Sequence, residues 1–317
     1  MAVSKASTNA SAASTVSDLI LRFHEDCSLR GMVSTMDYIY RAKEYCAFLE
    51  SRGKDPLNAD RDDLRAFLAH LKTRGLKFKT IDRIYSCLSA FYEFLIIDGL
   101  VEYNPILPFR KYYLRRYKHD NDSEIRKLIS VEDASRLVNS ILDTRDRCIL
   151  VLLFKTGMRV GELTSLDVSD VDLNKGEVTL KIKKKRSNRI LFLDNEAIAV
   201  LERWLIARKK RSGAEDPALF LSKIGTRITK RTVEELTLKH AERVGLHNPQ
   251  AERLEDRFTP HCCRHWFVTH LLRAGMPRDF VKELRGDTRG EAIDIYNHID
   301  KKELHDSYLA HVPQLGI

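Results

Sequence analysis

The sequence predicts a mainly helical protein of two domains, the second of which carries a small antiparallel β-sheet. Its 317 residues are enough for two domains of ordinary size. Apolar residues recur at helical spacing through residues 16–104, and helical patterns also dominate residues 128–317. Two strand-like segments, joined by a short basic turn, form a pair in the second half.

The first domain, residues 16–107, is predicted to be a bundle of about four helices. Its clearest amphipathic stripe steps by three and four residues through Ile81, Ile84, Leu88, Phe91 and Leu95. A glycine stands where each of three helices should end, namely Gly53, Gly75 and Gly99. We interpret these stripes as the core of the bundle and not as a cofactor site.

Two segments flank the bundle. Residues 1–15 are rich in Ser, Ala and Thr and lack the apolar stretch of a signal peptide, which predicts a disordered tail. Residues 108–127 are predicted to be a basic linker, since Pro105 and Pro108 should break the helix. Its cations include Arg110, Lys111, Arg115, Arg116 and Lys118. This cluster is either simply solvated or crosses the DNA backbone.

The second domain, residues 128–317, opens with Ser130 in a position to cap a helix. A buried helix from Cys148 to Lys155 should end at Thr156 and Gly157. The two predicted strands follow, at Gly176–Lys183 and Arg189–Leu193. Further helices are expected at about residues 195–211, 229–244, 260–274 and 277–285, with Thr259 and Pro260 opening the third of them.

Charge and cysteine content narrow the functional class. The formal net charge of +9 favours a polyanionic partner, nucleic acid first. No apolar run approaches the roughly 20 residues of a membrane helix, so we expect a cytoplasmic, DNA-associated protein without membrane contact. The six cysteines lack disulfide spacing, which predicts buried free thiols. Cys262 and Cys263 are adjacent, and no second metal-ligand cluster accompanies them, so no metal is expected.

Three short motifs in the second domain carry the functional signal. They are Thr156-Gly157-Met158-Arg159-Val160-Gly161-Glu162-Leu163, then His261-Cys262-Cys263-Arg264-His265, then Leu284-Arg285-Gly286-Asp287 with Tyr296 nine residues later. In this order, with a lysine-rich hairpin between the first two, they resemble the boxes of the tyrosine recombinases, the phage-integrase family. The resemblance spans about residue 16 to the C-terminus. It implies a SAM-like core-binding domain that clamps DNA, followed by a catalytic domain.

Tyr296 is the candidate nucleophile. Cleaving DNA without hydrolysis requires a side chain that stores the phosphodiester bond, and a phenol suits this role. A free phenol is ionised to only about one part in a thousand at pH 7, so its proton must be taken or its anion stabilised. Of the eleven tyrosines, only Tyr296 has the spacing of the family nucleophile. Tyr308 lacks that spacing and is expected to pack in the core.

Arg159 and Arg264 match the two phosphate-binding arginines of the family. Planar guanidiniums can bind the negative charge of the transition state bidentately. Glu162 lies one helical turn after Arg159 and either braces the site, as the resemblance implies, or makes a plain surface ion pair. His261 matches the family histidine that assists proton transfer and orients the phosphate, with helix capping as the alternative. His265 is expected to be structural.

The leaving 5′-oxygen needs a proton, which the family supplies from a hairpin lysine. Counting back from Arg189 with the family's K-x4-R spacing selects Lys184 as this general acid. Lys183 is the alternative, because the loop is one residue longer than usual. DNA contacts are expected from neighbouring hairpin cations and from the linker, namely Lys183, Lys185, Arg186, Arg115 and Arg116.

Asp287 departs from the family pattern, which usually has a His or Trp that donates a hydrogen bond to the phosphate. An ionised carboxylate can only accept hydrogen bonds. Two unit charges about 4 Å apart repel by roughly 4 kcal/mol at an effective dielectric of about 20. We therefore expect Asp287 to pair with a nearby arginine or cap a turn, to contribute little to catalysis, and to leave the phosphate clamp one donor short.

The resemblance implies a site-specific recombinase or integrase that forms a 3′-phosphotyrosyl link and frees a 5′-hydroxyl. No metal, nucleotide or other cofactor is expected, because the bond energy is conserved. It also implies four protomers on double-stranded DNA, with the C-terminal tail (Leu304, Leu309 and Val312) docking on a neighbouring protomer or, alternatively, in cis. Three alternatives remain: a type IB topoisomerase-like enzyme, a DNA-binding relative that has lost cleavage, and a generic basic helical regulator, which does not explain the order of the motifs.

Overall fold

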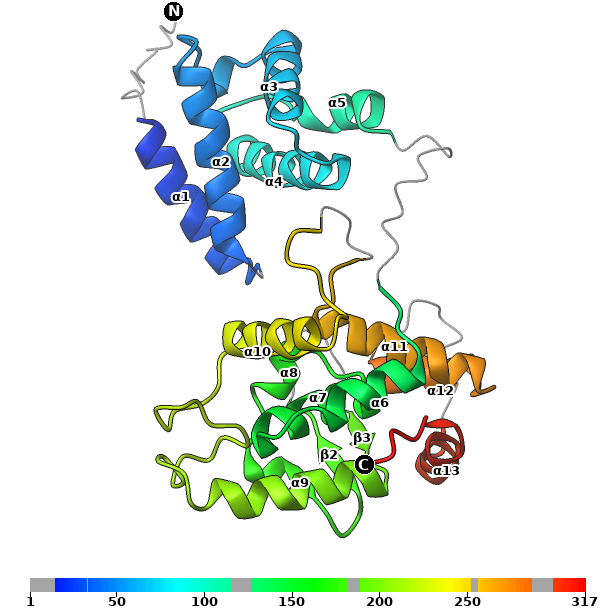
Figure 1. Ribbon diagram of the computed structural model, residues 1–317. Helices are drawn as coiled ribbons and strands as arrows, with labels where there is room; N and C mark the ends of the chain where they lie inside the picture. Colours follow the sequence, from blue (N-terminus) through cyan, green and yellow to red (C-terminus); the bar gives the residue numbers. More distant parts are fainter. Residues whose placement is uncertain (1–14, 33, 116–126, 182–188, 252–255, 287–298) are drawn as a thin grey trace, which may run out of the picture. The chain divides into compact units, whose positions relative to one another are not determined.

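The computed structural model describes residues 15–32, 34–115, 127–181, 189–251, 256–286 and 299–317 (Figure 1). Its contacts divide the chain into two compact units, Met1–Asn121 and Asp122–Ile317. The division falls within residues 108–127, where the sequence predicts a linker. Both units are mainly helical and the second carries a small antiparallel sheet, which confirms the predicted fold class.

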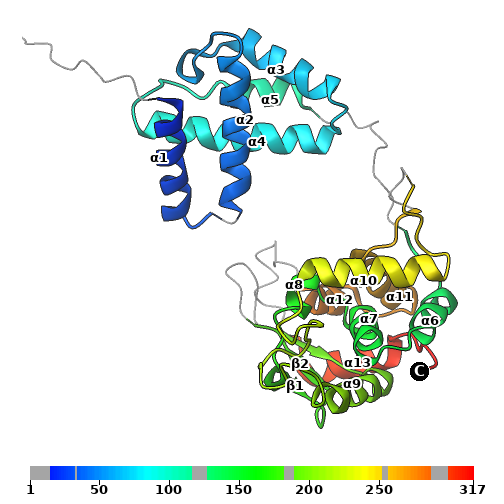
Figure 2. The ribbon, with the colours of Figure 1, turned by 60° about the vertical axis from the view of Figure 1, so that its left-hand side comes forward.

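Five α-helices form the described part of the first unit: α1 (Val16–Leu29), α2 (Thr35–Glu50), α3 (Arg61–Thr73), α4 (Phe78–Ile97) and α5 (Ile106–Tyr113). A short 3₁₀ turn, η1 (Pro56–Asn58), precedes α3. Helix α2 packs against both α1 and α4 (Figures 1 and 2). The predicted stripe of α4 is buried, and the three predicted glycines follow α2, α3 and α4 with positive φ, so the bundle is confirmed.

Helix α5 corrects the prediction that Pro105 and Pro108 end helical structure. Pro105 precedes the helix and Pro108 lies in its first turn. Backbone N–H groups there have no intrahelical acceptor, so neither ring costs a hydrogen bond. Phe109 is buried, and its ring stacks on that of Tyr85 with 5.2 Å between centroids. Residues 106–113 therefore pack into the first unit and do not form a linker.

The second unit is built around α7 (Thr144–Thr156), which is buried continuously from Cys148 to Thr156. Four helices pack around α7 (Figure 2): α6 (Val131–Asn139), α9 (Asn195–Arg208), α10 (Lys230–Arg243) and α11 (Pro260–Arg273). The other described helices of this unit are α8 (Val160–Leu163), α12 (Arg278–Arg285) and α13 (Lys301–His311). The predicted helices agree closely with α9 to α12, because caps and apolar spacing are local signals.

The sheet has three strands, β1 (Val171–Asp172), β2 (Glu177–Thr179) and β3 (Ile190–Phe192), paired antiparallel in that order. Val178 of β2 lies opposite Leu191 of β3, and both are buried. The strands β2 and β3 are shorter than predicted. The sequence prediction missed β1, because two residues after the 3₁₀ turn η2 (Val168–Asp170) carry no alternating pattern.

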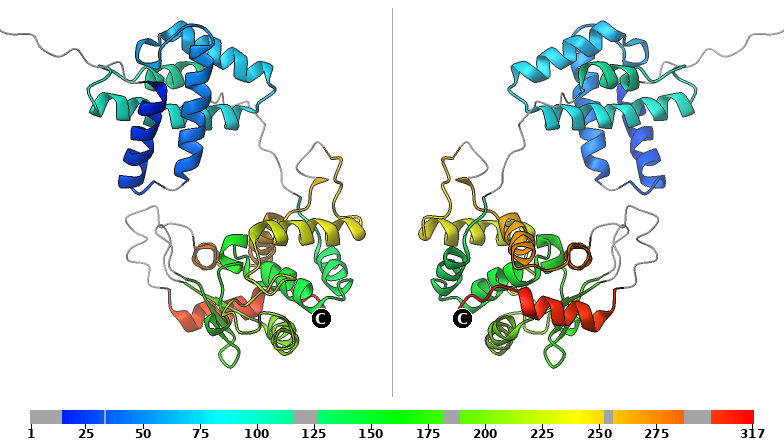
Figure 3. Two further views of the ribbon diagram at one scale, coloured as in Figure 1. Left: turned by 90° about the vertical axis from the view of Figure 1, so that its left-hand side faces the viewer. Right: turned by 90° about the vertical axis from the view of Figure 1, so that its right-hand side faces the viewer.

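The C-terminal segment packs on its own domain, which is the cis alternative. Leu304, Tyr308 and Val312 are buried, whereas Leu309 is 43% exposed and does not join the packing as expected. Helix α13 lies beside the sheet (Figure 3), and the ring of Phe192 in β3 contacts those of His305 and Tyr308. The predicted packing role of Tyr308 is thereby confirmed.

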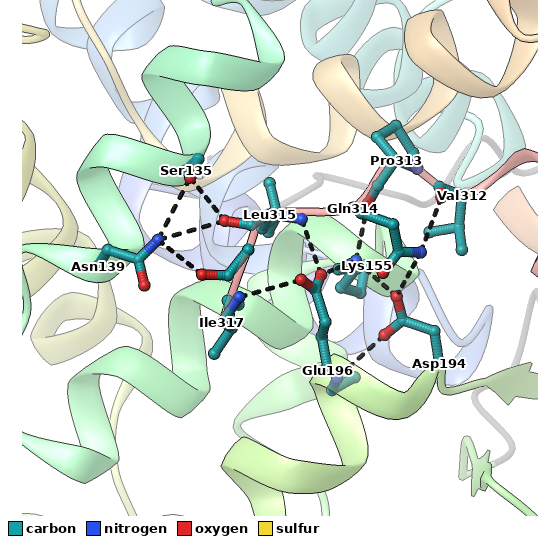
Figure 4. A network of polar contacts seen from close by, with 12 residues as sticks. Ser135, Asn139, Lys155, Asp194, Glu196, Val312, Pro313, Gln314, Leu315 and Ile317 are labelled. Atoms are coloured by element: carbon teal, nitrogen blue, oxygen red, sulfur yellow. Dashed lines mark hydrogen bonds and ion pairs between the residues drawn. The ribbon is translucent and has the colours of Figure 1, made fainter.

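Lys155, the second-last residue of α7, holds the end of this segment (Figure 4). Its ammonium group donates to the carbonyl oxygen of Pro313 at 2.7 Å. Glu196 accepts hydrogen bonds from the N–H groups of Leu315 at 2.8 Å and Ile317 at 3.0 Å. The tail is therefore fixed by polar contacts as well as by burial of its apolar side chains.

All six cysteines are buried and free, as predicted. Over the described ranges, no helix combines the length and the apolar character that crossing a bilayer would require.

Candidate active site

The first motif forms the corner between α7 and α8. Gly157 ends α7 with φ +59°, in the left-handed region that favours glycine. A Cβ atom on Gly157 would lie 2.3 Å from Cδ1 of Phe267 in α11, so this corner is packed tightly against that helix. Arg159 follows in an extended conformation as the N-cap residue of α8. The corner thus places the Arg159 side chain where it is partly exposed, while the Glu162 side chain is buried.

Glu162 braces Arg159, as the family resemblance implies. Its Oε2 accepts a hydrogen bond from the backbone N–H of Arg159 at 2.7 Å, and its Oε1 lies 3.3 Å from Nη1 of the same residue. Only 7% of the Glu162 side chain is exposed, compared with 30% for Arg159. The alternative of a plain surface ion pair is therefore wrong, because the carboxylate is buried.

Arg264 of α11 connects the same corner with the end of α12. It donates to the carbonyl oxygen of Gly157 at 2.6 Å and to that of Arg285 at 2.8 Å. Nη1 of Arg159 approaches the Arg285 carbonyl as well, at 3.5 Å. The guanidiniums of Arg159 and Arg264 therefore converge on one carbonyl oxygen, although they come from motifs more than 100 residues apart.

A fourth polar group, Arg189, completes this cluster. Its Nη2 lies 3.0 Å from Oε2 of Glu162, and 5% of the residue is exposed. Sequence reasoning used Arg189 only to count the hairpin spacing. The available signal was a lone arginine at the start of an apolar strand, a position where a charged side chain needs a partner.

The cluster carries excess positive charge. Burial and the neighbouring charge of Arg159 lower the pKa of the Arg264 guanidinium to about 10. The charges of Arg189 and Arg285 contribute to this lowering of the pKa, and the Glu162 carboxylate opposes it. A pKa near 10 still leaves Arg264 protonated at neutral pH, so a bound oxyanion would offset the repulsion between this guanidinium and its neighbours. The arrangement is suited to a phosphate group.

The histidines differ in exposure. His261 lies in the first turn of α11, one turn before Arg264, and is exposed. His265 is half-buried, and its Nδ1 lies 3.5 Å from Oγ1 of Thr269 on the same helix. The placement of His261 beside the Arg264 turn agrees with the motif, and the setting of His265 agrees with a structural role.

Several predicted site residues lie outside the described residues. They are Tyr296, Asp287, Lys183, Lys184, Lys185, Arg186 and Arg116. Arg115 is described and is exposed at the end of the first unit's described part. The described site therefore comprises Arg159, Glu162, Arg189, His261 and Arg264.

Each of the two units matches a domain of a known protein family. Residues 30–99 match the phage integrase N-terminal SAM-like domain, and residues 121–303 match the phage integrase family. Tyrosine recombinase XerC of Chromohalobacter salexigens is 32% identical over 293 residues, which cover 90% of this chain and 93% of the relative. Tyrosine recombinase XerC of Pelotomaculum thermopropionicum is 29% identical over 303 residues, covering 91% and 94%.

Solved structures share the fold. The Tn1549 transposon integrase in complex with transposon right end DNA aligns with a TM-score of 0.67 at 20% identity, covering 90% of this chain and 96% of that one. A lambda integrase dimer bound to a COC′ core site aligns with a TM-score of 0.64 at 18% identity, covering 90% and 98%.

A helical first unit, a second unit with a small sheet, and an arginine cluster suited to a phosphate define a class of DNA-processing enzyme. The chain belongs to the phage integrase family, the tyrosine recombinases, which break and rejoin DNA. The resemblance inferred from the three motifs is therefore confirmed.

Proposed function

We propose that this chain is a site-specific recombinase that cleaves double-stranded DNA through a 3′-phosphotyrosyl intermediate at Tyr296. The phenol passes its proton to His261 as its oxygen attacks the scissile phosphorus, the P–O5′ bond breaks, and the 5′-oxygen takes a proton from Lys184. A 5′-hydroxyl from a second strand then reverses the reaction. Arg159 and Arg264 bind the non-bridging oxygens, and His261 assists proton transfer. No cofactor takes part in this scheme.

The shared environment of Arg159 and Arg264 carries the proposal. Both guanidiniums approach the Arg285 carbonyl, and Glu162 holds Arg159 from its buried side. Donors held in this way need no reorganisation when charge develops on the phosphate. Replacing Arg264 with Lys keeps one charge but removes the planar fork, and we expect adduct formation to slow by about 100-fold or more.

Covalent capture tests the proposal without a known target sequence. The full chain is incubated with sheared genomic DNA of its source organism, denatured, and the DNA that remains attached is sequenced. We expect one enriched sequence and a peptide containing Tyr296 linked to DNA, both absent with Tyr296→Phe. Enrichment of covalent DNA by Tyr296→Phe, or no adduct with the wild type, contradicts the proposal.

Two further outcomes separate the alternatives. A relative that has lost cleavage enriches DNA without a covalent bond, whereas a type IB topoisomerase forms adducts without sequence choice. Joining of two labelled duplexes that carry the enriched sequence is expected only from a recombinase.

We also propose that the enzyme assembles as a tetramer on two DNA sites in the cytoplasm. The linker and hairpin cations, such as Arg115, Arg116 and Lys185, contact the DNA backbone in this assembly. Participation of the C-terminal tail requires its release, because Leu304 and Val312 are buried in their own domain. Cross-linking of the chain with and without the enriched duplex measures the assembly.

A further inference from the structure

Arg189 is, like Arg264, a buried cation of the arginine cluster. It directly precedes β3, and its carbonyl oxygen accepts a hydrogen bond from the N–H of Leu180 across the hairpin at 3.0 Å. Only 3% of its side chain is exposed, compared with 30% for Arg159. Arg159 is therefore open to a ligand in solvent, whereas the Arg189 guanidinium faces Glu162 and the end of α12.

The Glu162 carboxylate is shared between these two arginines. Its Oε2 accepts from Nη2 of Arg189 at 3.0 Å, and its Oε1 faces Nη1 of Arg159 at 3.3 Å. The ion pair with Arg189 holds this carboxylate beside α8, where its Oε2 also accepts the backbone N–H of Arg159 at 2.7 Å.

Arg189 also packs against the turn that ends α12. Gly286 is the C-cap of α12, with φ +61°. A Cβ atom at this position would lie 1.8 Å from Nη1 and 2.5 Å from Cζ of Arg189. The guanidinium therefore lies directly on the main chain of Gly286. The preceding residue is Arg285, whose carbonyl receives both Arg159 and Arg264.

We propose that Arg189 is a positioning residue for the strand-transfer reaction. By holding the Glu162 carboxylate and the Gly286 turn, it fixes the direction of the Arg159 guanidinium toward the phosphate. Arg189 acts through Glu162 and does not touch DNA. This role rests on the proposed function, because it requires Arg159 to bind the scissile phosphate.

Adduct formation by the full chain tests this role. The substrate is the duplex enriched by covalent capture, with a nick beside the mapped cut so that the adduct accumulates. Arg189→Gln is compared with Arg208→Gln. Arg208 is a matched control, since it is 6% exposed and, among the described residues, donates only to backbone carbonyl oxygens, including that of Ala218 in the same unit.

We expect Arg189→Gln to slow adduct formation at saturating DNA by about 10- to 100-fold, with DNA affinity changed by less than about threefold. Arg208→Gln should lower thermal stability yet cleave within about twofold of the wild type. Arg189→Lys, which keeps the charge, should recover part of the rate. If Arg189→Gln does not fold, Arg189→Lys against the wild type gives the same comparison.

A double variant tests the route through Glu162. Arg189→Gln with Glu162→Gln should be no slower than the slower single variant, because both changes remove one shared interaction. Effects that multiply would overturn the proposal, as would wild-type cleavage by Arg189→Gln.

A sulfur-bridged substrate tests the other route, through the hairpin. A 5′-thiolate leaves without a proton, so full rescue of Arg189→Gln by this substrate would assign the defect to the general acid and overturn the role proposed. The defect is expected to persist. Absence of any adduct with the wild type is a different result, which contradicts the proposed function and removes the role of Arg189 with it.

Discussion

The ammonium group of Lys155 lies 2.6 Å from the Glu196 carboxylate, and none of its side chain is exposed. The Asp194 carboxylate lies 2.5 Å from the same nitrogen. Glu196 in turn accepts the N–H groups of Leu315 and Ile317. One buried cation therefore connects the central helix α7 with the start of α9 and with the C-terminal tail.

Replacing Lys155 with Met should destabilise the second unit by about 3–5 kcal/mol, because two buried carboxylates lose their cation. The two tryptophans of the chain, Trp204 and Trp266, are both buried in this unit, so urea unfolding followed by tryptophan fluorescence reports it alone. Lys175→Met is the control, since Lys175 is 69% exposed and pairs with Asp172 at the surface. A loss below about 1 kcal/mol for Lys155→Met would contradict the buried network.

The Glu196 network should also weaken in acid. Burial acts to raise the pKa of Glu196, but hydrogen bonds from Lys155 and from the N–H groups of Leu315 and Ile317 outweigh it and hold this pKa below its ordinary value. A carboxyl whose pKa is lowered on folding stabilises the protein above its unfolded pKa, near 4.3. That contribution is lost as the pH falls through the folded pKa.

The stability difference between the wild type and Glu196→Gln should therefore narrow from pH 7 toward pH 3. Urea unfolding at each pH, followed by tryptophan fluorescence, measures it. A difference that stays constant over this range would show that Glu196 does not titrate as its contacts require.

The sequence predicted those parts of the fold that local signals determine. The apolar stripe around Leu88 and the glycine at position 157 fix helix faces and ends within a few residues of chain. Helix α5 was not predicted, because a tertiary contact between Phe109 and Tyr85 stabilises it. Its prolines lie before the helix and in its first turn, where they remove no intrahelical hydrogen bond. Strand β1 was not predicted, because its pairing with β2 defines it and its two residues show no apolar–polar alternation.

The site divides in the same way. Motif spacing selected Arg159, Glu162 and Arg264, since their motifs occur along the chain in the same order as in the family. Spacing did not reveal that Arg189 is enclosed against Glu162, or that one carbonyl of Arg285 receives two arginines. These contacts join α8, α11, α12 and the hairpin, and only the folded chain brings them together.

Gly157→Ala should be more destabilising than Gly245→Ala, although both glycines have positive φ. Alanine in the left-handed region costs about 1 kcal/mol at either position. At Gly157 the new methyl group also meets Phe267 at 2.3 Å, whereas nothing lies within 4 Å at Gly245. Overpacking should add about 1–3 kcal/mol at Gly157 alone. Equal losses in urea unfolding would exclude the Phe267 contact as the reason for glycine.

Asp287→Asn should change the rate of adduct formation by less than about tenfold. A carboxylate close to the scissile phosphate would repel it by roughly 4 kcal/mol at about 4 Å, so little catalytic contribution is expected from this side chain. Removing its charge should then matter little, whereas Tyr296→Phe abolishes the adduct. A loss with Asp287→Asn as deep as that of Tyr296→Phe would refute a minor role.

Asp287→His tests whether the clamp lacks a donor. A histidine at this position can donate a hydrogen bond to a non-bridging oxygen, which the carboxylate cannot. The longer imidazole side chain should reach a non-bridging oxygen, so the histidine variant should form the adduct faster than the wild type, by up to about tenfold for one added donor. Asp287→Gln is the matched comparison. Its side chain is also longer than that of aspartate and neutral, and its amide can donate a hydrogen bond. A slower rate for both variants would mean that Asp287 itself supports the local fold, which their thermal stability would show independently.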